Sequence, residues 1–152
     1  GVTVSSTHLR ALLKDGKMEE AVRFLGHGHI ISGIVQHGDS RGHTLGLPTA
    51  NLALDASLLV PAFGVYGGWA DAGELGRYPT AVNLGVHPTV HELPRPVAEA
   101  SLLGFDGDLY GKFLRLELLF QVRPERQFSS LQELTAQIAR DQQTVLHRLT
   151  GV

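Results

Sequence analysis

The stretch His43–Leu54, HTLGLPTANLAL, carries the pattern from which the fold of this chain is predicted. Its apolar residues alternate around a Pro-Thr-Ala-Asn centre, as they do in a half-buried strand. Pro48 has no backbone N–H, so it favours the start or the edge of a strand. Thr49 and Asn51 are two positions apart, and on an extended chain their side chains therefore project from the same face.

A glycine-rich segment, Gly38-Asp-Ser-Arg-Gly42, leads into this strand. A glycine-rich backbone can approach a ligand closely. The hydroxyl of Thr49 and the amide oxygen of Asn51 are hard, neutral oxygen ligands, which suit magnesium bound to phosphate. The same residues also fit a polar strand face that follows a turn, because short motifs of this kind recur without function.

The composition limits the class of protein. A chain of 152 residues suits one domain with a sizeable core. A formal net charge of −2 and the lack of a Lys/Arg block argue against nucleic-acid binding. Disulfides and thiolate metal sites are excluded because there is no cysteine. No apolar run reaches the roughly 20 residues of a membrane span, and no signal-peptide pattern opens the chain. We expect a cytoplasmic protein without membrane or nucleic-acid partners, and a first residue of Gly indicates a fragment or a processed chain.

Residues 1–26 show the apolar spacing of helices. Ser5 or Ser6 can cap a first short helix through Leu13, and Gly16 would end it. A second short helix is predicted over Lys17–Leu25, with Gly26 after it. Helices of this length are marginal alone, so we expect both to pack on the rest of the chain.

From His27 onward the apolar period changes to two. Several short strands without helices between them predict an antiparallel barrel or sandwich, and closure of the sheet would remove its exposed edges. The predicted strands are His29–His37, Leu47–Leu54, Gly64–Asp71, Pro79–Gly85, Val97–Leu103 and Lys112–Val122, with Gly- and Pro-containing turns between them.

A final helix is predicted from about Ser130 to residue 149. Ser130 and Glu133 have the spacing of a capping box. An apolar stripe follows, long enough for the helix to lie across a barrel. Its members are Leu131, Leu134, Ile138, Val145 and Leu149.

Two groups of titratable residues lead to opposite conclusions. The eight histidines include the pair His27 and His29, but no second cluster at metal-ligand spacing follows, and we reject a metal role. Glu99 lies in an otherwise apolar strand, where a carboxylate costs free energy unless it has a partner or a task. It is therefore a candidate general base for a substrate alcohol, and the alternative is a strand glutamate that faces solvent.

The sequence resembles the riboflavin kinase family at several motifs in order. Gly42–Asn51 is similar to the family signature, a glycine-containing loop followed by G-[FI]-P-T-A-N, although no Walker A pattern is present. Further similar segments are Phe63–Tyr66, Asn83–Thr89, Ala98-Glu99, Asp108–Gly111 and Arg123 with Phe128. The resemblance covers residues 26–149. It implies a six-stranded antiparallel Greek-key barrel with a C-terminal helix, which transfers the γ-phosphoryl of ATP to the 5′-hydroxyl of riboflavin.

The resemblance also implies roles for individual residues. Glu99 would be the catalytic base, and Thr49 and Asn51 would hold Mg²⁺. ATP would be bound by Gly38, Ser40, Arg41, Gly42, His43, Leu45, Gly46, Pro48, Thr49 and Asn51. The flavin would be bound by Asn83, Gly85, Thr89, Leu109, Tyr110, Gly111, Arg123, Phe128 and Leu131.

Four positions depart from the family pattern. Leu47 stands where bacterial members usually have Phe, and Ser101 and Gly104 stand where His and Asp are common. His87 replaces an Arg and removes a permanent charge. The change at His87 motivates an alternative, a non-catalytic flavin- or nucleotide-binding regulatory module. An oligonucleotide-binding barrel is a third possibility, which the absence of a basic patch disfavours.

The opening segment carries a second resemblance. Val4–Arg10, VSSTHLR, is similar to the end of the FMN adenylyltransferase module of bifunctional bacterial FAD synthetases. The rest of that module is missing from the sequence, so no adenylyltransferase activity is expected. The resemblance implies that residues 1–26 are a C-terminal remnant of that module and that 27–152 form a riboflavin kinase domain, monomeric as a fragment.

Overall fold

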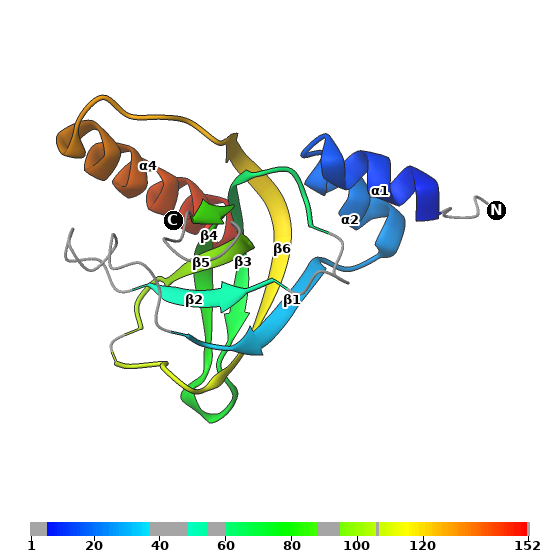
Figure 1. Cartoon of the computed structure of the whole chain (residues 1–152). Coiled ribbons are helices and arrows are strands. Elements are labelled where there is room, and N and C mark those ends of the chain that lie inside the picture. The colour runs from blue at the N-terminus through cyan, green and yellow to red at the C-terminus, as the bar shows by residue number, and fades with distance from the viewer. Residues whose placement is uncertain (1–5, 37–48, 55–59, 88–94, 106, 152) are drawn as a thin grey trace.

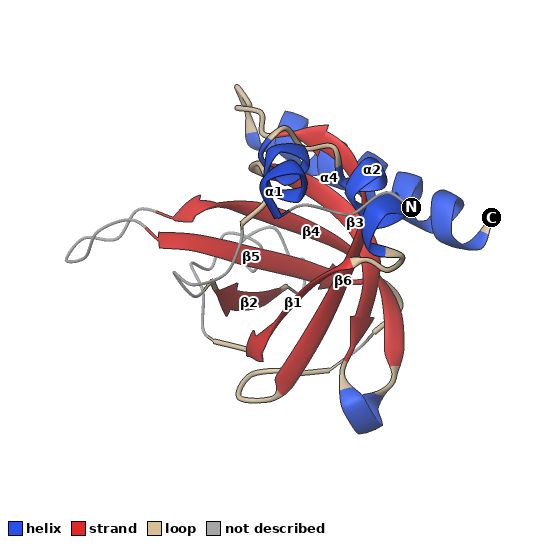
Figure 2. Cartoon of the chain, turned by 90° about the vertical axis from the view of Figure 1, so that its right-hand side faces the viewer, coloured by secondary structure: helices blue, strands red, loops and turns tan. Residues whose placement is uncertain are grey.

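Six antiparallel strands form the centre of the molecule, and helices lie against its outside (Figures 1 and 2). The structure is a computed structural model, and it describes residues 6–36, 49–54, 60–87, 95–105 and 107–151. The helices are α1 (Ser6–Lys14), α2 (Met18–Leu25), the short 3-10 helix η1 (Gly73–Leu75) and α4 (Leu131–Thr150). The strands are β1 (His29–Ile34), β2 (Ala50–Ala53), β3 (Gly64–Asp71), β4 (Arg77–His87), β5 (Arg95–Leu102) and β6 (Phe113–Pro124).

The sheet is a nearly closed barrel. Its strand order is β1-β6-β3-β4-β5-β2, and every described pairing is antiparallel. An isolated bridge between Gln36 and Asn51 joins the two outer strands. Because β1 pairs with β6 and β5 lies between β4 and β2, the chain follows a Greek-key path. The predicted fold class is confirmed.

The alternation of β6 builds one wall of the core. Leu114, Leu116 and Leu118 are fully buried, whereas Phe113 and Arg115, which alternate with them, are exposed. The barrel interior continues into the N-terminal helices, since Leu13 and Met18 belong to the same buried cluster. The expectation that α1 and α2 pack on the rest of the chain is therefore confirmed.

The bounds of several strands differ from the predicted ones, and two of these strands, β1 and β2, meet where the barrel closes. β1 ends at Ile34: the Val35 N–H still donates to Lys112, directly before β6, whereas the Gln36 N–H turns to Asn51 of β2. β2 covers only Ala50–Ala53 rather than Leu47–Leu54. β4 begins at Arg77, two residues before the predicted start, since Arg77 still pairs with β3.

Two consecutive glycines let β3 approach β6 closely. The register between these strands shifts at Gly67/Gly68. A Cβ on Gly68 would collide with the carbonyl oxygen of Glu117, and one on Gly67 would collide with the Phe120 ring. Only glycine fits at this approach, which bends β6 around the barrel as β-bulges do.

Helix α4 crosses the outer face of the barrel, where its Val145 packs with Ala81 and Phe120 (Figure 1). Ser130 caps it, and its side chain accepts a hydrogen bond from the Glu133 N–H at 3.1 Å, as predicted. The Glu133 carboxylate instead accepts a hydrogen bond from the Ser129 hydroxyl at 2.6 Å. This hydrogen bond and the neighbouring Arg126 lower the pKa of Glu133.

Tyr66 on β3 gives the fold a pH dependence at alkaline pH. Its side chain is fully buried, and its hydroxyl donates a hydrogen bond to the carbonyl oxygen of Ala62 at 2.6 Å. Burial raises the pKa of Tyr66 from 10.0 to about 12, and a hydrogen bond with Gln121 opposes the rise. Since the folded pKa exceeds the unfolded one, the contribution to stability is complete below pH 10.0 and is lost as the pH rises to about 12.

We expect Tyr66→Phe to lower the free energy of unfolding by about 1 kcal/mol at neutral pH, because the Ala62 carbonyl loses its donor. The difference between the two proteins should shrink as the pH approaches 12, since only the wild type has a phenol to ionise. Urea unfolding followed by circular dichroism across this pH range measures both curves. Parallel curves would contradict the assignment.

Candidate active site

The candidate site residues lie in one row across the outer face of the barrel. Glu99 of β5 is directly opposite Asn51 of β2 on one side and Asn83 of β4 on the other. In antiparallel sheets, directly opposed residues project from the same face. Their chain neighbours, among them Ala98, Ala100 and Leu52, fill the barrel interior, so these three polar side chains all point outward.

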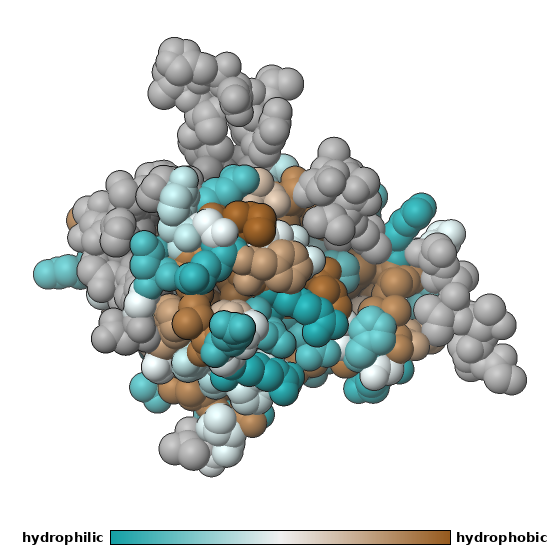
Figure 3. Space-filling model, turned by 90° about the horizontal axis from the view of Figure 1, so that it is seen from below, coloured by the Kyte–Doolittle hydropathy of each residue, from teal (hydrophilic) through white to brown (hydrophobic). Residues whose placement is uncertain are grey.

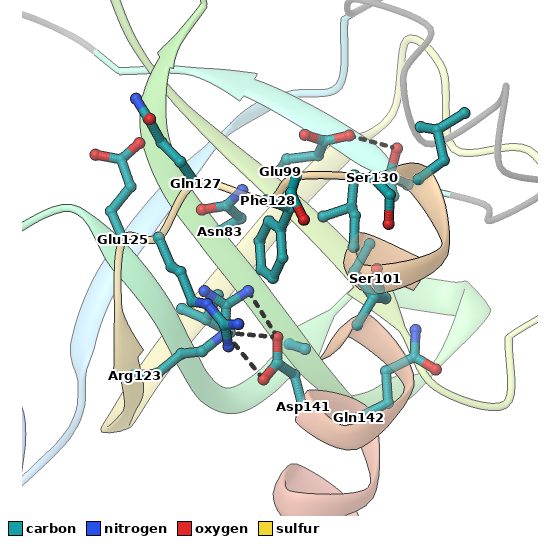
Figure 4. Close-up of a pocket in the computed structure, with 18 residues that line it drawn as sticks. Asn83, Glu99, Ser101, Arg123, Glu125, Gln127, Phe128, Ser130, Asp141 and Gln142 are labelled. Atoms are coloured by element: carbon teal, nitrogen blue, oxygen red, sulfur yellow. Dashed lines mark hydrogen bonds and ion pairs between the residues drawn. The ribbon is translucent and has the colours of Figure 1, made fainter. Parts of the chain in front are cut away.

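Glu99 also contacts Thr49, which precedes Asn51 by two residues. The Thr49 hydroxyl donates a hydrogen bond to Glu99 Oε1 at 3.2 Å (the upper dashed line in Figure 4). Residues 49 and 99 are far apart in sequence, and the pairing of β2 with β5 brings them together. The half-buried carboxylate therefore lies beside both oxygen-bearing residues of the Pro-Thr-Ala-Asn segment.

Asn51 carries an unsatisfied oxygen. Its residue is only 8% exposed, and its Oδ1 is buried without a hydrogen-bond partner among the described residues. A buried amide oxygen without a donor costs about 1–3 kcal/mol, so such an atom indicates a missing ligand. A hard cation is suited to it, because magnesium binds neutral and anionic oxygens. The donor set of Thr49 and Asn51 thus fits a magnesium ion bound to phosphate.

A cavity of about 940 Å³ opens beside Glu99, between the barrel and α4 (Figure 4). Its barrel wall is polar and includes Thr49, Asn83, Glu99 and Ser101. The wall formed by α4 and the segment before it is mixed: it contributes the apolar residues Phe128, Leu131, Leu134 and Ile138 among polar ones such as Gln127, Ser130 and Gln142. Such a cavity suits an amphipathic ligand with one flat apolar part and one hydroxyl-bearing part.

Arg123 closes the cavity at the end far from Glu99. Glu99 pairs with Asn83, Asn83 with Val65, and Val65 with Arg123. Arg123 is therefore three strand spacings from Glu99 along the sheet, or about 14 Å. Its guanidinium lies 5.4 Å from the Phe128 ring centroid, and that of Arg126 lies 4.9 Å from the same centroid. The aromatic ring is thus held by two cation–π contacts.

Asp141 of α4 holds this arginine, and sequence reasoning missed it. Its carboxylate accepts hydrogen bonds from Arg123 Nε at 3.1 and 3.0 Å, and an ion pair at 3.0 Å joins it to Arg123 Nη2. The available signal was its spacing: Asp141 lies three residues after Ile138 and four before Val145, so it is an acid within the apolar stripe of the helix.

Other predicted residues lie elsewhere. Leu109 is in the buried core, and Gly111 donates its N–H to Val35, on the β1 side of the bridge between Gln36 and Asn51. Tyr110 is 53% exposed. These three do not line the α4 cavity, whereas Asn83, Arg123, Phe128 and Leu131 do. Gly85 lies next to Glu125, a residue that lines it.

Several predicted residues lie outside the part of the chain that the structure describes. They are Thr89 and the predicted ATP-binding residues Gly38, Ser40, Arg41, Gly42, His43, Leu45, Gly46 and Pro48.

The remaining surface is mixed in character. On the face shown in Figure 3, hydrophilic and apolar side chains are interspersed. Among the described residues, no group of three or more His, Asp or Glu side chains could hold a metal ion. No described helix is long and apolar enough to cross a membrane.

Comparison with known proteins gives consistent results. The family model described as riboflavin kinase matches residues 25–149. The bifunctional riboflavin kinase/FMN adenylyltransferase of Bacillus subtilis is 40% identical over 152 residues, which are 98% of this chain and 48% of that protein. The chain therefore spans about half the length of the curated relatives it matches.

Two solved structures share the fold. A crystal structure of riboflavin kinase from Trypanosoma brucei has a TM-score of 0.60 at 27% identity, over 82% of this chain and 83% of that one. A protein named as a macrolide-efflux protein from Streptococcus pneumoniae has a TM-score of 0.84 at 31% identity, over 94% of this chain and 46% of that one.

Proposed function

Because the chain belongs to the riboflavin kinase family, we propose that it transfers the γ-phosphoryl group of ATP to the 5′-hydroxyl of riboflavin and releases FMN and ADP. The observation that carries the proposal is the contact between Thr49 and Glu99, beside the unsatisfied Oδ1 of Asn51. One base and one metal–phosphate site suffice for this reaction, since positioning and charge neutralisation supply most of the catalysis.

The shape of the cavity supports riboflavin as the acceptor. The apolar side chains of Phe128 and Leu131 in the cavity wall suit the flat isoalloxazine ring. The polar wall leads from Asn83 to Glu99 and suits the hydroxyls of the ribityl chain. With the ring near Arg123, the span of about 14 Å across three strand spacings would bring the end of the chain to Glu99.

Glu99 is proposed as the general base. The 5′-hydroxyl oxygen of riboflavin forms a bond to the γ-phosphorus, and the bond from that phosphorus to the bridging oxygen of ADP breaks. The hydroxyl proton passes to the Glu99 carboxylate. The Thr49 hydroxyl, which donates to Oε1, orients this carboxylate. Thr49 and Asn51 would hold Mg²⁺, which when bound neutralises charge on the phosphate oxygens.

Further parts of the proposal concern the nucleotide and the parent protein. The segment Gly38–Gly46 would cover ATP. Residues 1–26 would be the end of an adenylyltransferase module and 27–152 the kinase domain of a bifunctional enzyme, which is supported by a family match that begins at residue 25. The fragment would act as a monomer in the cytoplasm, with small-molecule partners only.

The test is an assay of the purified chain with riboflavin, ATP and Mg²⁺. We expect FMN to appear with one ADP per FMN, and to require both ATP and the metal. Direct titration of flavin fluorescence in the same samples reports binding without turnover. Riboflavin binding without FMN formation would overturn the proposal and favour the non-catalytic flavin-binding module.

A further inference from the structure

Asp141 is the buried polar residue of α4 for which the reaction itself has no task. Its side chain is 5% exposed, although most other charged residues of this helix face solvent. Burial of a carboxylate is costly unless charges and hydrogen bonds compensate it. Here Arg123 supplies the charge, and Gln137 Nε2 donates a further hydrogen bond to Oδ1 at 2.9 Å.

The geometry of this contact fixes the guanidinium of Arg123. Nε and Nη2 both meet the same carboxylate, so the plane of the group is set from one side (lower dashed lines in Figure 4). Nη1 donates to the carbonyl oxygen of Pro124 at 3.4 Å. A guanidinium held in this way presents its face to Phe128 in a constant orientation.

Phe128 depends on such support because of its position. It lies on the segment between β6 and α4, and its ring is half-buried in the cavity wall. Arg126, the other cation at the ring, is itself half-exposed and is bound at 2.8 Å by Glu133, whose side chain is 35% exposed. Surface ion pairs hold their side chains weakly, so the buried Arg123–Asp141 pair is the stronger constraint.

We propose that Asp141 is a positioning residue of the flavin pocket, which acts through Arg123 to hold the Phe128 ring as a wall for the isoalloxazine ring. The inference rests on the proposed function for the identity of the ligand. Asp141 does not touch the reacting atoms, which lie at the Glu99 end of the cavity. Its loss should therefore weaken flavin binding and leave the chemical step and ATP binding in place.

The test is Asp141→Asn, which preserves the size of the side chain but turns an N–H₂ group toward the donors of Arg123. We expect the Kd for riboflavin, measured by flavin fluorescence without ATP, to rise about ten-fold, or about 1.4 kcal/mol, the size of one aromatic stack. The KM for riboflavin should rise in parallel, while kcat and the KM for ATP stay within about two-fold. A simple loss of folded protein would lower kcat instead.

A second ligand and two further variants make the result specific. Lumiflavin, an isoalloxazine without the ribityl chain, should lose about the same factor, because the contact is to the ring. Arg123→Lys retains the charge opposite Asp141 but not the paired N–H groups, so it should reproduce the effect even if Asp141→Asn does not fold. Glu19→Gln removes the other 3.0 Å ion pair of α4, with Arg148 outside the cavity, and should leave the Kd unchanged.

Three outcomes would overturn the inference. The first is that Arg123→Lys, or a folded Asp141→Asn, binds lumiflavin as tightly as the wild type does. The second is that Glu19→Gln loses as much flavin affinity as these variants, and the third is that the wild type binds no flavin. The proposed function is judged separately by FMN formation in the wild type. A wild type that binds flavin without phosphorylating it would refute the proposed function. The role of Asp141 would still be tested by comparing the flavin Kd of the variants with that of the wild type.

Discussion

Glu99→Gln is expected to lower kcat for FMN formation by about 10²-fold or more, the usual contribution of a general base. The glutamine keeps the size of the side chain and its hydrogen bond with Thr49, but it cannot accept the proton of the 5′-hydroxyl. The KM values for riboflavin and ATP should stay within about three-fold, because the contribution is made in the transition state. Steady-state kinetics at saturating ATP and Mg²⁺ measures all three.

Glu117→Gln is a suitable control for this change. Glu117 is also a half-buried strand glutamate, with a side chain 25% exposed that accepts a hydrogen bond from the Gly28 N–H at 3.0 Å. It lies on β6 and does not line the cavity. Its variant should turn over at the wild-type rate. A Glu99→Gln enzyme with normal kcat would remove Glu99 from the mechanism.

Asn51→Ala is expected to raise the Mg²⁺ concentration for half-maximal activity by about ten-fold or more, since loss of groups around a metal commonly costs 10–100-fold in affinity. The variant removes the buried Oδ1 that has no partner among the described residues. Removal of a buried, unsatisfied oxygen also relieves a desolvation cost, so the melting temperature of the variant should fall little or not at all.

Activity measured over a series of Mg²⁺ concentrations, together with thermal unfolding, tests both parts. Riboflavin binding without metal serves as the internal control and should not change, because Asn51 does not line the cavity beside α4. Superimposable Mg²⁺ titrations of the variant and the wild type would exclude Asn51 as a metal ligand.

Most of the fold can be predicted from local patterns in the sequence. Alternation of Leu114, Leu116 and Leu118 with polar residues identified β6 and its buried face, and the Ser130 cap identified the start of α4. The way in which the barrel closes is harder to predict from the sequence. It depends on the turn of Gln36 from the β6 side to Asn51 of β2, which is a choice between long-range partners and leaves no local pattern.

The candidate site can be predicted only in part, because it too depends on contacts between residues far apart in the sequence. Thr49 and Asn51 could be placed on one face from their spacing alone, and the structure adds that Glu99 is their neighbour. The partnership of Arg123 with Asp141 could not be predicted, since residues 18 apart meet only when α4 folds back over the barrel. The period of the helix places Asp141 between Ile138 and Val145 on the barrel-facing side, but it does not show which cation Asp141 meets there.

The outward row of Asn51, Glu99 and Asn83 alternates with inward residues on the same three strands. In the proposed mechanism, the residues that bind the substrates and promote the reaction therefore lie at odd-numbered positions of β2, β5 and β4, and the even-numbered positions fill the barrel core. Substitutions of Asn83, which is exposed on this row, are therefore expected to change acceptor preference with little effect on the barrel core. A melting temperature measured on such variants would consequently carry little information about turnover.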